Sequence, residues 1–327
     1  MVGRSLAIRR AIRLIEEAAP TSAPVIITGD SGTGKELAAR AIHDKSPRHN
    51  RPYVAINCAA VPESLIESEL FGHERGAFTG ADRRREGCFE RANGGSLLLD
   101  EITEMRPEMQ AKLLRVLEEG SILRLGATRE LPIDVRVFAA SNRSLTQAIR
   151  EGRLRADLYY RLNVYTIELP PLRDRLEDLP LLVAHFIREF NREHSKRIEG
   201  MGQDCFDALR AHRWPGNVRE LRNIVQRAVI RCQSPMLSAE DLPLEPVALR
   251  GQAEAHFLVQ LGSSVYEVER ELIVRTLAYA GGNKKRASDI LGMSRRNLYN
   301  RLNGYAAHDQ NGHLNGHVYR NGRNGGS

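Results

Sequence analysis

The sequence predicts an α/β fold with a mainly parallel sheet, followed by all-helical modules. Short apolar segments that resemble buried strands alternate with amphipathic helices through the first half of the chain. This alternation favours a parallel sheet covered by helices on both faces. After Pro170 and Pro171 the pattern becomes helical, so we expect a second, compact helical module there.

The elements can be placed in order from their apolar patterns. Apolar residues at helical spacing predict a first helix over Leu6–Ala19. Further helices are expected at 35–43 and 109–118, and in the helical module at 179–194, 204–212 and 218–231. Short apolar runs predict strands at 25–28, 52–57, 96–100, 135–140 and 165–169.

Composition narrows the function classes. The chain has 327 residues, enough for two or three domains, and 42% apolar residues, enough for a sizeable core. No apolar run approaches membrane-spanning length and no signal-peptide pattern is present, which predicts a cytoplasmic protein without a membrane partner. The scattered Cys58, Cys88, Cys205 and Cys232 lack metal spacing and are expected to be buried or idle thiols. The net charge of +7 suits a polyanionic partner.

A phosphate-binding loop follows the first predicted strand and opens the next helix. It consists of Gly29, Asp30, Ser31, Gly32, Thr33, Gly34 and Lys35. In such a loop the backbone N–H groups converge on phosphates, and the lysine reaches the β- and γ-phosphates of ATP. Glu36 stands where the general pattern has Ser or Thr for Mg²⁺, so metal binding must depend on other groups.

Acidic and polar residues at later strand ends complete the predicted ATP site. The strand over 96–100 ends in Asp100 and Glu101. We expect Asp100 to hold Mg²⁺ and Glu101 to polarise the attacking water, which makes the reaction hydrolysis. Asn142, after the fourth strand, is expected to contact the γ-phosphate or orient water. Arg155 and Arg161 are candidates for stabilising transition-state charge, often from a neighbouring subunit.

A glycine-bounded segment has no role in nucleotide chemistry. It consists of Gly76, Ala77, Phe78, Thr79, Gly80 and Ala81, with an aromatic ring and a hydroxyl between two glycines. Glycine lets the chain reverse sharply at positive φ. The composition suits a loop tip that touches another molecule, although an ordinary surface turn has the same features.

The chain resembles the bacterial enhancer-binding proteins, NtrC-like AAA+ activators of sigma-54 RNA polymerase. The resemblance covers most of residues 1–245, in the family's order. Its matching stretches are GDSGTGKE (29–36), NCAA (57–60), ESELFGHERGAFTGA (67–81), GGSLLLDEI (94–102), RADLYYRLNV (155–164), LPPLRDR (169–175) and WPGNVREL (214–221). Asp30, where Glu is commoner, and Leu154, where Phe is frequent, are departures.

The resemblance implies an AAA+ P-loop NTPase with a helical lid subdomain, and it assigns roles to residues. Glu36 is ordinary in this family. Asn57 matches the residue that contacts the catalytic glutamate, and Arg219 matches the sensor arginine of the lid. Arg155 and Arg161 match the trans-acting arginine fingers, so the active form would be a hexameric ring. The segment from Gly76 to Ala81 matches the loop that engages sigma-54 in the RNA polymerase holoenzyme, with Phe78 and Thr79 at its tip.

The last helices predict a DNA-binding end. Two short helices surround a tight turn at Gly292–Ser294, which is typical of a helix-turn-helix. Ala287, Ile290, Leu291, Leu298 and Leu302 would form its core, and Ser294 would cap the second helix. Candidate DNA contacts are Lys284, Lys285, Ser294, Arg295, Arg296, Asn297, Tyr299, Asn300 and Arg301. This part also resembles Fis-like domains, which bind enhancer DNA as dimers, with the helix over 265–280 as the pairing surface.

The predicted organisation has five parts. These are an α/β subdomain (1–170), a helical lid (171–245), a linker (246–264), a Fis-like helix-turn-helix domain (265–305) and a disordered tail (306–327). No regulatory domain precedes residue 1, so we expect either a truncated chain or control by a separate partner. Two alternatives remain. A different AAA+ machine would share the ATP site but leave the 76–81 loop unexplained. A non-enzymatic DNA-binding regulator would not need Lys35, Asp100 and Glu101.

Overall fold

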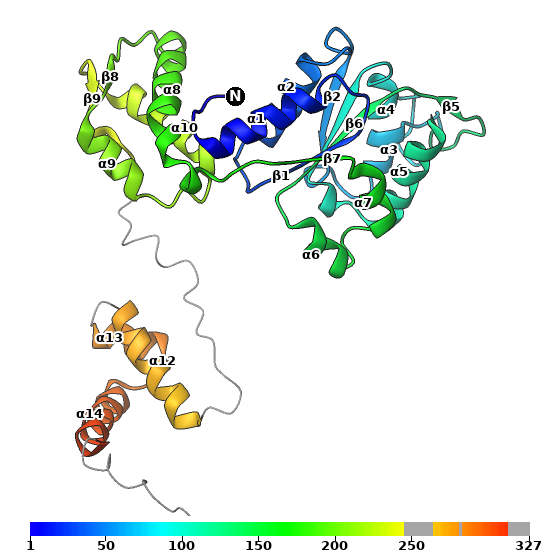
Figure 1. The fold of residues 1–327 in the computed structure, drawn as a ribbon. Helices are drawn as coiled ribbons and strands as arrows, with labels where there is room; N and C mark the ends of the chain where they lie inside the picture. The colour runs from blue at the N-terminus through cyan, green and yellow to red at the C-terminus, as the bar shows by residue number, and fades with distance from the viewer. Residues whose placement is uncertain (245–263, 281–282, 313–327) are drawn as a thin grey trace, which may run out of the picture. The chain divides into compact units, whose positions relative to one another are not determined.

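The computed structural model describes residues 1–244, 264–280 and 283–312, which fall into two compact units within Met1–Leu244 and Glu245–Ser327. The first unit contains the predicted sheet (Figure 1). Its five strands are all parallel, in the order β2-β3-β6-β1-β7. They are β1 (Val25–Thr28), β2 (Tyr53–Asn57), β3 (Ser96–Asp100), β6 (Arg136–Ser141) and β7 (Tyr165–Glu168).

Alternate residues of the central strands pack on opposite faces of the sheet, as the pleat requires. One face is covered by α1 (Leu6–Ala18) and α2 (Lys35–Asp44), which bury Leu98 and Phe138. The other face buries Leu97, Leu99 and Val137 under the remaining helices. These are α3 (Ile66–Phe71), α4 (Cys88–Arg91), α5 (Pro107–Glu119), α6 (Leu145–Arg150) and α7 (Ala156–Leu162). The predicted α/β class is therefore confirmed.

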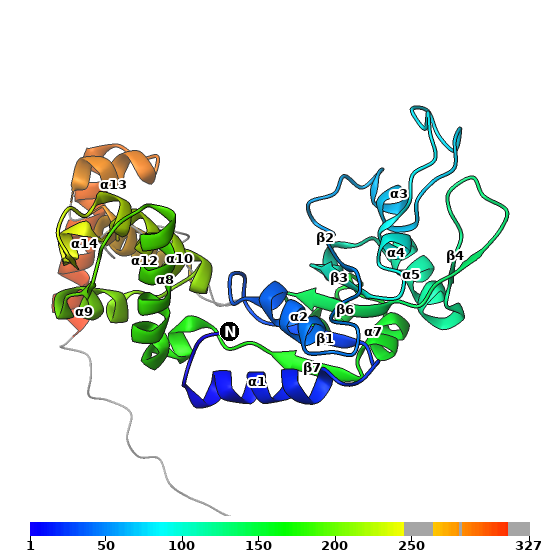
Figure 2. The same ribbon diagram turned by 90° about the horizontal axis from the view of Figure 1, so that it is seen from above.

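A small hairpin and a neighbouring loop extend from the second face. Strands β4 (Ser121–Ile122) and β5 (Leu131–Pro132) form the antiparallel hairpin. The segment between α3 and α4 projects from the sheet beside it (Figure 2), and an isolated bridge joins His73 to Leu125. This projecting segment contains the predicted sigma-54 loop.

The lid is mostly helical, with one difference from the prediction. Its helices are α8 (Leu179–Glu193), α9 (Gln203–Ala211) and α10 (Asn217–Arg231), and they enclose the buried Trp214. A two-residue parallel pair, β8 (Gly200–Met201) with β9 (Met236–Leu237), ties the chain after α8 to the chain after α10. The expectation of an all-helical module was wrong here, because these two-residue strands have no period that the sequence could reveal.

The described residues of the second unit form the helices α12 (Val265–Tyr279), α13 (Lys284–Ile290) and α14 (Arg295–Gly312). Helix α14 continues through residues 306–312, which were expected to belong to a disordered tail. The rest of that tail and all but the last residue of the predicted linker lie outside the described residues. Ile290, expected in the core, is half exposed, whereas Ile273 and Tyr305 are buried with Ala287 and Leu298.

Two further expectations can be compared with the described residues. All four cysteines are buried and free, and burial raises the pKa of the Cys58 thiol to about 12, so this thiol is not a nucleophile. In the described ranges, no helix is both long enough and apolar enough to cross a membrane.

Candidate functional site

The phosphate loop connects β1 to α2, as predicted. Gly29, Gly32 and Gly34 all have positive φ, and Gly34 precedes the first turn of α2. The Thr33 hydroxyl donates to the Asp30 carbonyl at 2.8 Å, which closes the loop. Lys35 is almost fully buried, and its Nζ donates to the Gly29 carbonyl at 3.0 Å. The result is a glycine-rich loop at a helix N-terminus, the arrangement that receives phosphates.

The predicted acidic residues meet this loop at the carboxyl edge of the sheet. The Glu101 carboxylate lies 3.7 Å from the Lys35 ammonium, and its other oxygen accepts the Asn142 backbone N–H at 3.1 Å. Glu101 has φ of 54°, a left-handed conformation that is uncommon for a non-glycine residue. Such strained residues concentrate at functional sites. The structure thus brings Lys35, Glu101 and Asn142 together.

Asn57 does not make the contact that the family resemblance implies. Its side-chain NH₂ donates to Asp100 Oδ2 at 3.4 Å, and its side-chain oxygen Oδ1 accepts the backbone N–H groups of Ala59 and Ala60. Glu101 instead faces Lys35. The physical reason is that β2 and β3 are in register with Asn57 opposite Asp100, while the ammonium attracts the Glu101 carboxylate.

The lid supplies further residues to the phosphate loop. The Arg219 guanidinium donates to the Ser31 hydroxyl at 3.3 Å, so the predicted sensor arginine does lie beside the loop. The neighbouring Asn217 amide donates to the Ser31 carbonyl at 2.9 Å. Asp30 pairs with Arg173 at 2.8 Å. Sequence reasoning assigned no role to Asn217 or Arg173, although both lie inside motifs that it quoted. Glu36, which follows Lys35, is exposed on α2.

The two candidate finger arginines lie apart from this cluster. Arg155 forms two hydrogen bonds with the Asp157 carboxylate, which lower the pKa of that carboxyl. Arg161 donates to the Leu117 carbonyl at 2.7 Å. Both are exposed, and within residues 1–244 neither forms a hydrogen bond or ion pair with Lys35 or Glu101.

The glycine-bounded loop is a closed tip. The Gly76 N–H donates to the Ala81 carbonyl, and the Ala81 N–H donates to the Phe78 carbonyl. Gly76 and Gly80 have positive φ with no atom near the position of a Cβ, so they are required for conformation and not for space. Phe78 is 37% exposed and rests edge-on against the His73 ring. Thr79 is exposed and Ala81 is buried, so Ala81 supports the tip.

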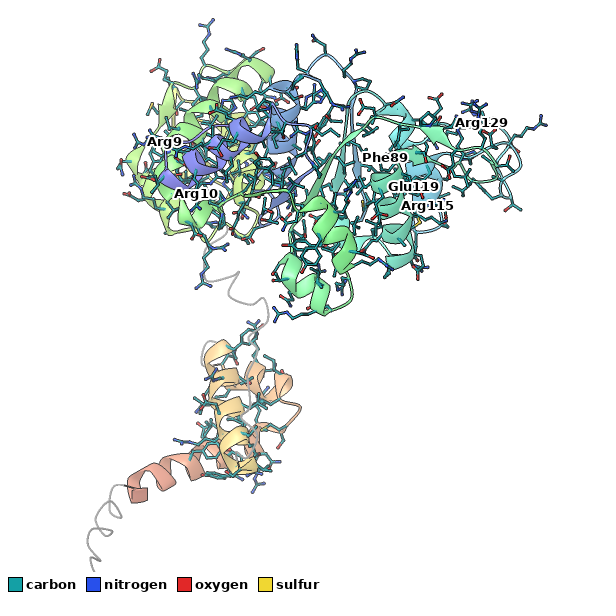
Figure 3. All side chains as sticks on the ribbon, turned by 45° about the vertical axis from the view of Figure 1, so that its right-hand side comes forward. Arg9, Arg10, Phe89, Arg115, Glu119 and Arg129 are labelled. Carbon is teal, nitrogen blue, oxygen red and sulfur yellow. The ribbon has the colours of Figure 1, made fainter. Side chains whose placement is uncertain are left out.

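The base of this loop is anchored to the core at both ends. Phe71 and Phe89, which flank the segment, are buried and stack with ring centroids 5.8 Å apart; Phe89 is labelled in Figure 3. Arg124, at the start of the loop between β4 and β5, forms ion pairs with Glu74 and Glu90. Burial raises the pKa of the Glu90 carboxyl, but the Arg124 hydrogen bonds outweigh it and the net shift is downward. The exposed tip is therefore attached to a base that buried aromatic rings and ion pairs hold in place.

The second unit has the geometry of a helix-turn-helix. Gly292, with φ of 64°, turns the chain between α13 and α14, and the Ser294 hydroxyl accepts the Asn297 N–H as the predicted cap. All nine candidate DNA contacts are exposed. Three of them also contact groups of their own unit: Arg301 pairs with Glu269 at 3.1 Å, and the Lys284 ammonium lies 4.0 Å from the Tyr299 ring centre.

The donor set at the sheet edge fits a magnesium ion held with a nucleotide. Asp100 is a carboxylate at the end of β3, across from the phosphate loop, and it is the residue predicted to bind the metal. Mg²⁺ at nucleotide sites is held by one or two carboxylates together with phosphate oxygens. The described residues contain no group of three or more His, Cys, Asp or Glu side chains that could hold a metal ion.

Comparison with known proteins agrees with this geometry. Residues 1–168 match the sigma-54 interaction domain, residues 173–256 the AAA+ ATPase lid domain, and residues 264–305 the Fis family of bacterial regulatory proteins. The transcriptional regulatory protein ZraR of Escherichia coli K12 is 48% identical over 307 residues, covering 92% of this chain and 68% of ZraR. FlbD of Caulobacter vibrioides is 45% identical over 319 residues, covering 94% of this chain and 70% of FlbD.

A solved structure extends the similarity to three dimensions. The crystal structure of NtrX from Brucella abortus has a TM-score of 0.70 and 36% identity, covering 93% of this chain and 68% of NtrX. NtrX has also been crystallised in complex with ATP and with ADP. With its P-loop NTPase sheet, helical lid and Fis-type helix-turn-helix, this chain belongs to the family of sigma-54-dependent AAA+ transcriptional activators.

Proposed function

We propose that the chain hydrolyses ATP in a hexameric ring and uses that energy to remodel sigma-54 RNA polymerase holoenzyme for promoter opening, while its second unit binds upstream enhancer DNA. The main support for ATP hydrolysis is the position of Glu101 at the sheet edge, where it pairs with Lys35 and accepts the Asn142 backbone N–H. A carboxylate beside a phosphate-loop lysine can act as the base that activates water, while the lysine binds the phosphate to be transferred.

The chemistry follows from these residues. The N–H groups of the loop from Gly29 to Gly34 and the Lys35 ammonium would hold the β- and γ-phosphates. Glu101 would accept a proton from the water whose oxygen attacks the γ-phosphorus, as the bond to the bridging oxygen breaks and ADP leaves. Asp100 would hold Mg²⁺, which neutralises phosphate charge when bound. Asn142 would orient Glu101 through its backbone N–H.

Completion of the site by a neighbouring subunit accounts for Arg155 and Arg161. Arg155 immediately precedes α7 and Arg161 lies on it, and both are exposed. Within residues 1–244, Arg155 is hydrogen-bonded to Asp157 and Arg161 to the Leu117 carbonyl of α5. An arginine supplied from another subunit stabilises charge on the transferring phosphoryl group. A ring in which each α7 faces the next nucleotide site would make hydrolysis depend on assembly.

The strand ends connect the nucleotide site to the sigma-54 loop. Asn57 ends β2, contacts Asp100, and is followed by the segment that leads through α3 to Phe71 at the base of the loop. Nucleotide state can move the loop only if the two conformations interact differently with the γ-phosphate. We propose that Glu101 leaves Lys35 when ATP binds and that Asn57 exchanges Asp100 for Glu101, which shifts α3 and the loop.

The test combines hydrolysis with promoter opening. Wild-type chain is incubated with sigma-54 holoenzyme on a sigma-54 promoter, and opening is followed by strand reactivity with permanganate. We expect opening with ATP, none with a non-hydrolysable analogue, and none with Lys35→Ala. Hydrolysis without nucleotide-dependent binding to sigma-54 would favour a different AAA+ machine. Opening without any hydrolysis would favour a non-enzymatic regulator.

A further inference from the structure

The turn that opens the last lid helix is seated directly on the phosphate loop. The Asn217 amide donates to the Ser31 carbonyl at 2.9 Å. The backbone N–H groups of Val218 and Arg219 both donate to the Gly32 carbonyl, at 3.0 and 3.2 Å. Asn217 is fully buried. Three hydrogen bonds thus join α10 to two consecutive carbonyls of the loop.

These hydrogen bonds satisfy N–H groups at the N-terminus of the helix that would otherwise lack an acceptor. The first N–H groups of an α-helix have no partner within the helix and need an acceptor from elsewhere. The residue before α10 is Gly216, which has no side chain that could cap it. The Gly32 carbonyl takes that place. The N-terminus of the lid helix is therefore capped by the nucleotide-binding loop of the sheet domain.

Asn217 also reaches the segment that joins sheet and lid. Its side-chain oxygen accepts the Leu172 backbone N–H at 2.8 Å. The position thus needs a donor toward Ser31 and an acceptor toward Leu172. It also has φ of 50°, a region that Asn enters more readily than most residues. Aspartate lacks the donor and glycine lacks both groups, so among side chains suited to this backbone only asparagine makes both contacts.

Gly32 is constrained from the same side. A Cβ on Gly32 would lie 2.3 Å from the Gly216 carbonyl oxygen and 3.1 Å from the Arg219 Cβ. The absence of a side chain at Gly32 therefore permits close approach of the lid in addition to any approach of phosphate. A residue with a side chain at position 32 would therefore push the loop and the lid apart.

We propose that Asn217 is a positioning residue for ATP binding, which fixes the phosphate loop and Arg219 in one relative geometry. In a trans peptide the N–H points opposite to the carbonyl. Holding the Ser31 carbonyl against Asn217 therefore directs the Gly32 N–H away from the lid, where it is available to a phosphate. The same hydrogen bonds fix the first residues of α10 against the loop, and with them the position of Arg219. This inference rests on the proposed binding of ATP at the loop.

The experiment compares matched asparagine substitutions in the lid. Asn217→Asp removes the donor to Ser31, and Asn217→Gly removes both contacts while keeping the backbone conformation accessible and adding no charge. The control is Asn191→Asp, which removes a similar donor, to the Ile198 carbonyl at 2.7 Å, at a site that does not touch the loop. All are measured for Kd of a fluorescent ATP analogue, for KM and kcat of hydrolysis, and for thermal unfolding.

We expect both Asn217 variants to raise Kd and KM about tenfold, the loss expected for one or two well-formed hydrogen bonds. Asn191→Asp should lower the unfolding temperature as much as Asn217→Asp while leaving Kd and KM unchanged. Wild-type affinity in Asn217→Gly, or an equal rise in Kd for the Asn191 control, would overturn the proposal. If the wild-type chain binds no ATP, the proposed function itself fails.

A double-mutant cycle identifies the route of action. If Asn217 acts partly by placing Arg219, Asn217→Gly should raise Kd much less in an Arg219→Ala background than in the wild type. Fully additive effects of the two substitutions, in variants that unfold at the same temperature, would show that Asn217 does not act through Arg219 and would contradict that part of the proposal.

Discussion

The Lys35 ammonium and the Glu101 carboxylate lie 3.7 Å apart, with both side chains largely buried. The residue expected to hold phosphates and the residue expected to activate water are thus paired with each other. A phosphate entering the loop would compete with Glu101 for the lysine charge. ATP binding would then release Glu101 for a second position, which links occupancy of the loop to the posture of the catalytic carboxylate.

Glu101→Gln should separate binding from hydrolysis. Glutamine has the same shape but cannot accept the proton from water, so hydrolysis should fall by roughly a hundredfold or more. ATP affinity should be retained or increased, because Lys35 loses a competing partner. Phosphate release and nucleotide Kd measure the two effects.

The control for this substitution is Glu104→Gln. Glu104 lies one turn further along and pairs with Arg143 at 3.0 Å, away from Lys35. The Glu104→Gln variant should hydrolyse ATP at the wild-type rate. Appreciable hydrolysis by Glu101→Gln, or an equal loss in Glu104→Gln, would remove the catalytic role from Glu101.

The sequence predicted the members of the nucleotide site better than their contacts. A phosphate loop after a strand and two acids at another strand end fix Lys35, Asp100 and Glu101 at one edge, because parallel strands end together. The partner of Asn57 was not predictable in this way. It depends on the register of β2 with β3 and on the charge of Lys35, which residue identities alone do not set.

The lid contacts show the same limit. The WPGN stretch indicates a turn before a helix, but nothing in it states that Asn217 bonds with a loop almost two hundred positions earlier. The predicted end of the last helix, before residue 306, was wrong for a different reason. The residues after Tyr305 are polar and glycine-containing, which argues against a helix, yet the helix runs on to Gly312.

Arg161→Ala should reduce hydrolysis sharply while nucleotide binding stays nearly intact. An arginine that acts on the transition state from a neighbouring subunit contributes on the order of a thousandfold to turnover. In the part of the chain that the structure describes, the Arg161 guanidinium is hydrogen-bonded to one backbone carbonyl, that of Leu117, so its loss should not unfold α7. Turnover is measured above the concentration at which the oligomer forms.

Arg188→Ala provides the comparison for this prediction. Arg188 is likewise exposed and donates to a backbone carbonyl, that of Ala184 in the lid. Its turnover should be unaffected. Mixing Arg161→Ala with Lys35→Ala chains should restore part of the activity, because each defect would lie on a different side of a subunit contact. No rescue and a wild-type rate for Arg161→Ala would each rule out a finger in trans.

Arg296→Ala should weaken DNA binding by the second unit. Arg296 is exposed in the first turn of α14, and the basic charge there suits phosphate or base contact. If it contacts phosphate, affinity should fall on all sequences, and the slope of log K against log salt should decrease by about one. Arg275→Ala, which removes the same charge from a side chain paired with Glu271 on α12, should have little effect.

Thr79→Ala tests the assignment of the projecting loop. Thr79 is exposed at a tip closed by the hydrogen bonds of Gly76 and Ala81, so losing its hydroxyl should not disturb the fold or the distant Lys35. ATP hydrolysis should therefore remain largely intact. Open-complex formation at a sigma-54 promoter should be abolished, because the loop could no longer engage sigma-54.

Thr128→Ala is the matched control, since it removes an exposed threonine hydroxyl from the neighbouring hairpin. It should hydrolyse ATP and open promoters like the wild type. Trapping with ADP and aluminium fluoride adds a direct readout: the wild type and Thr128→Ala should bind sigma-54 and Thr79→Ala should not. Normal promoter opening by Thr79→Ala would exclude the tip hydroxyl from engaging sigma-54. Loss of opening in both variants would mean that the whole projecting surface, hairpin included, contributes to engaging sigma-54.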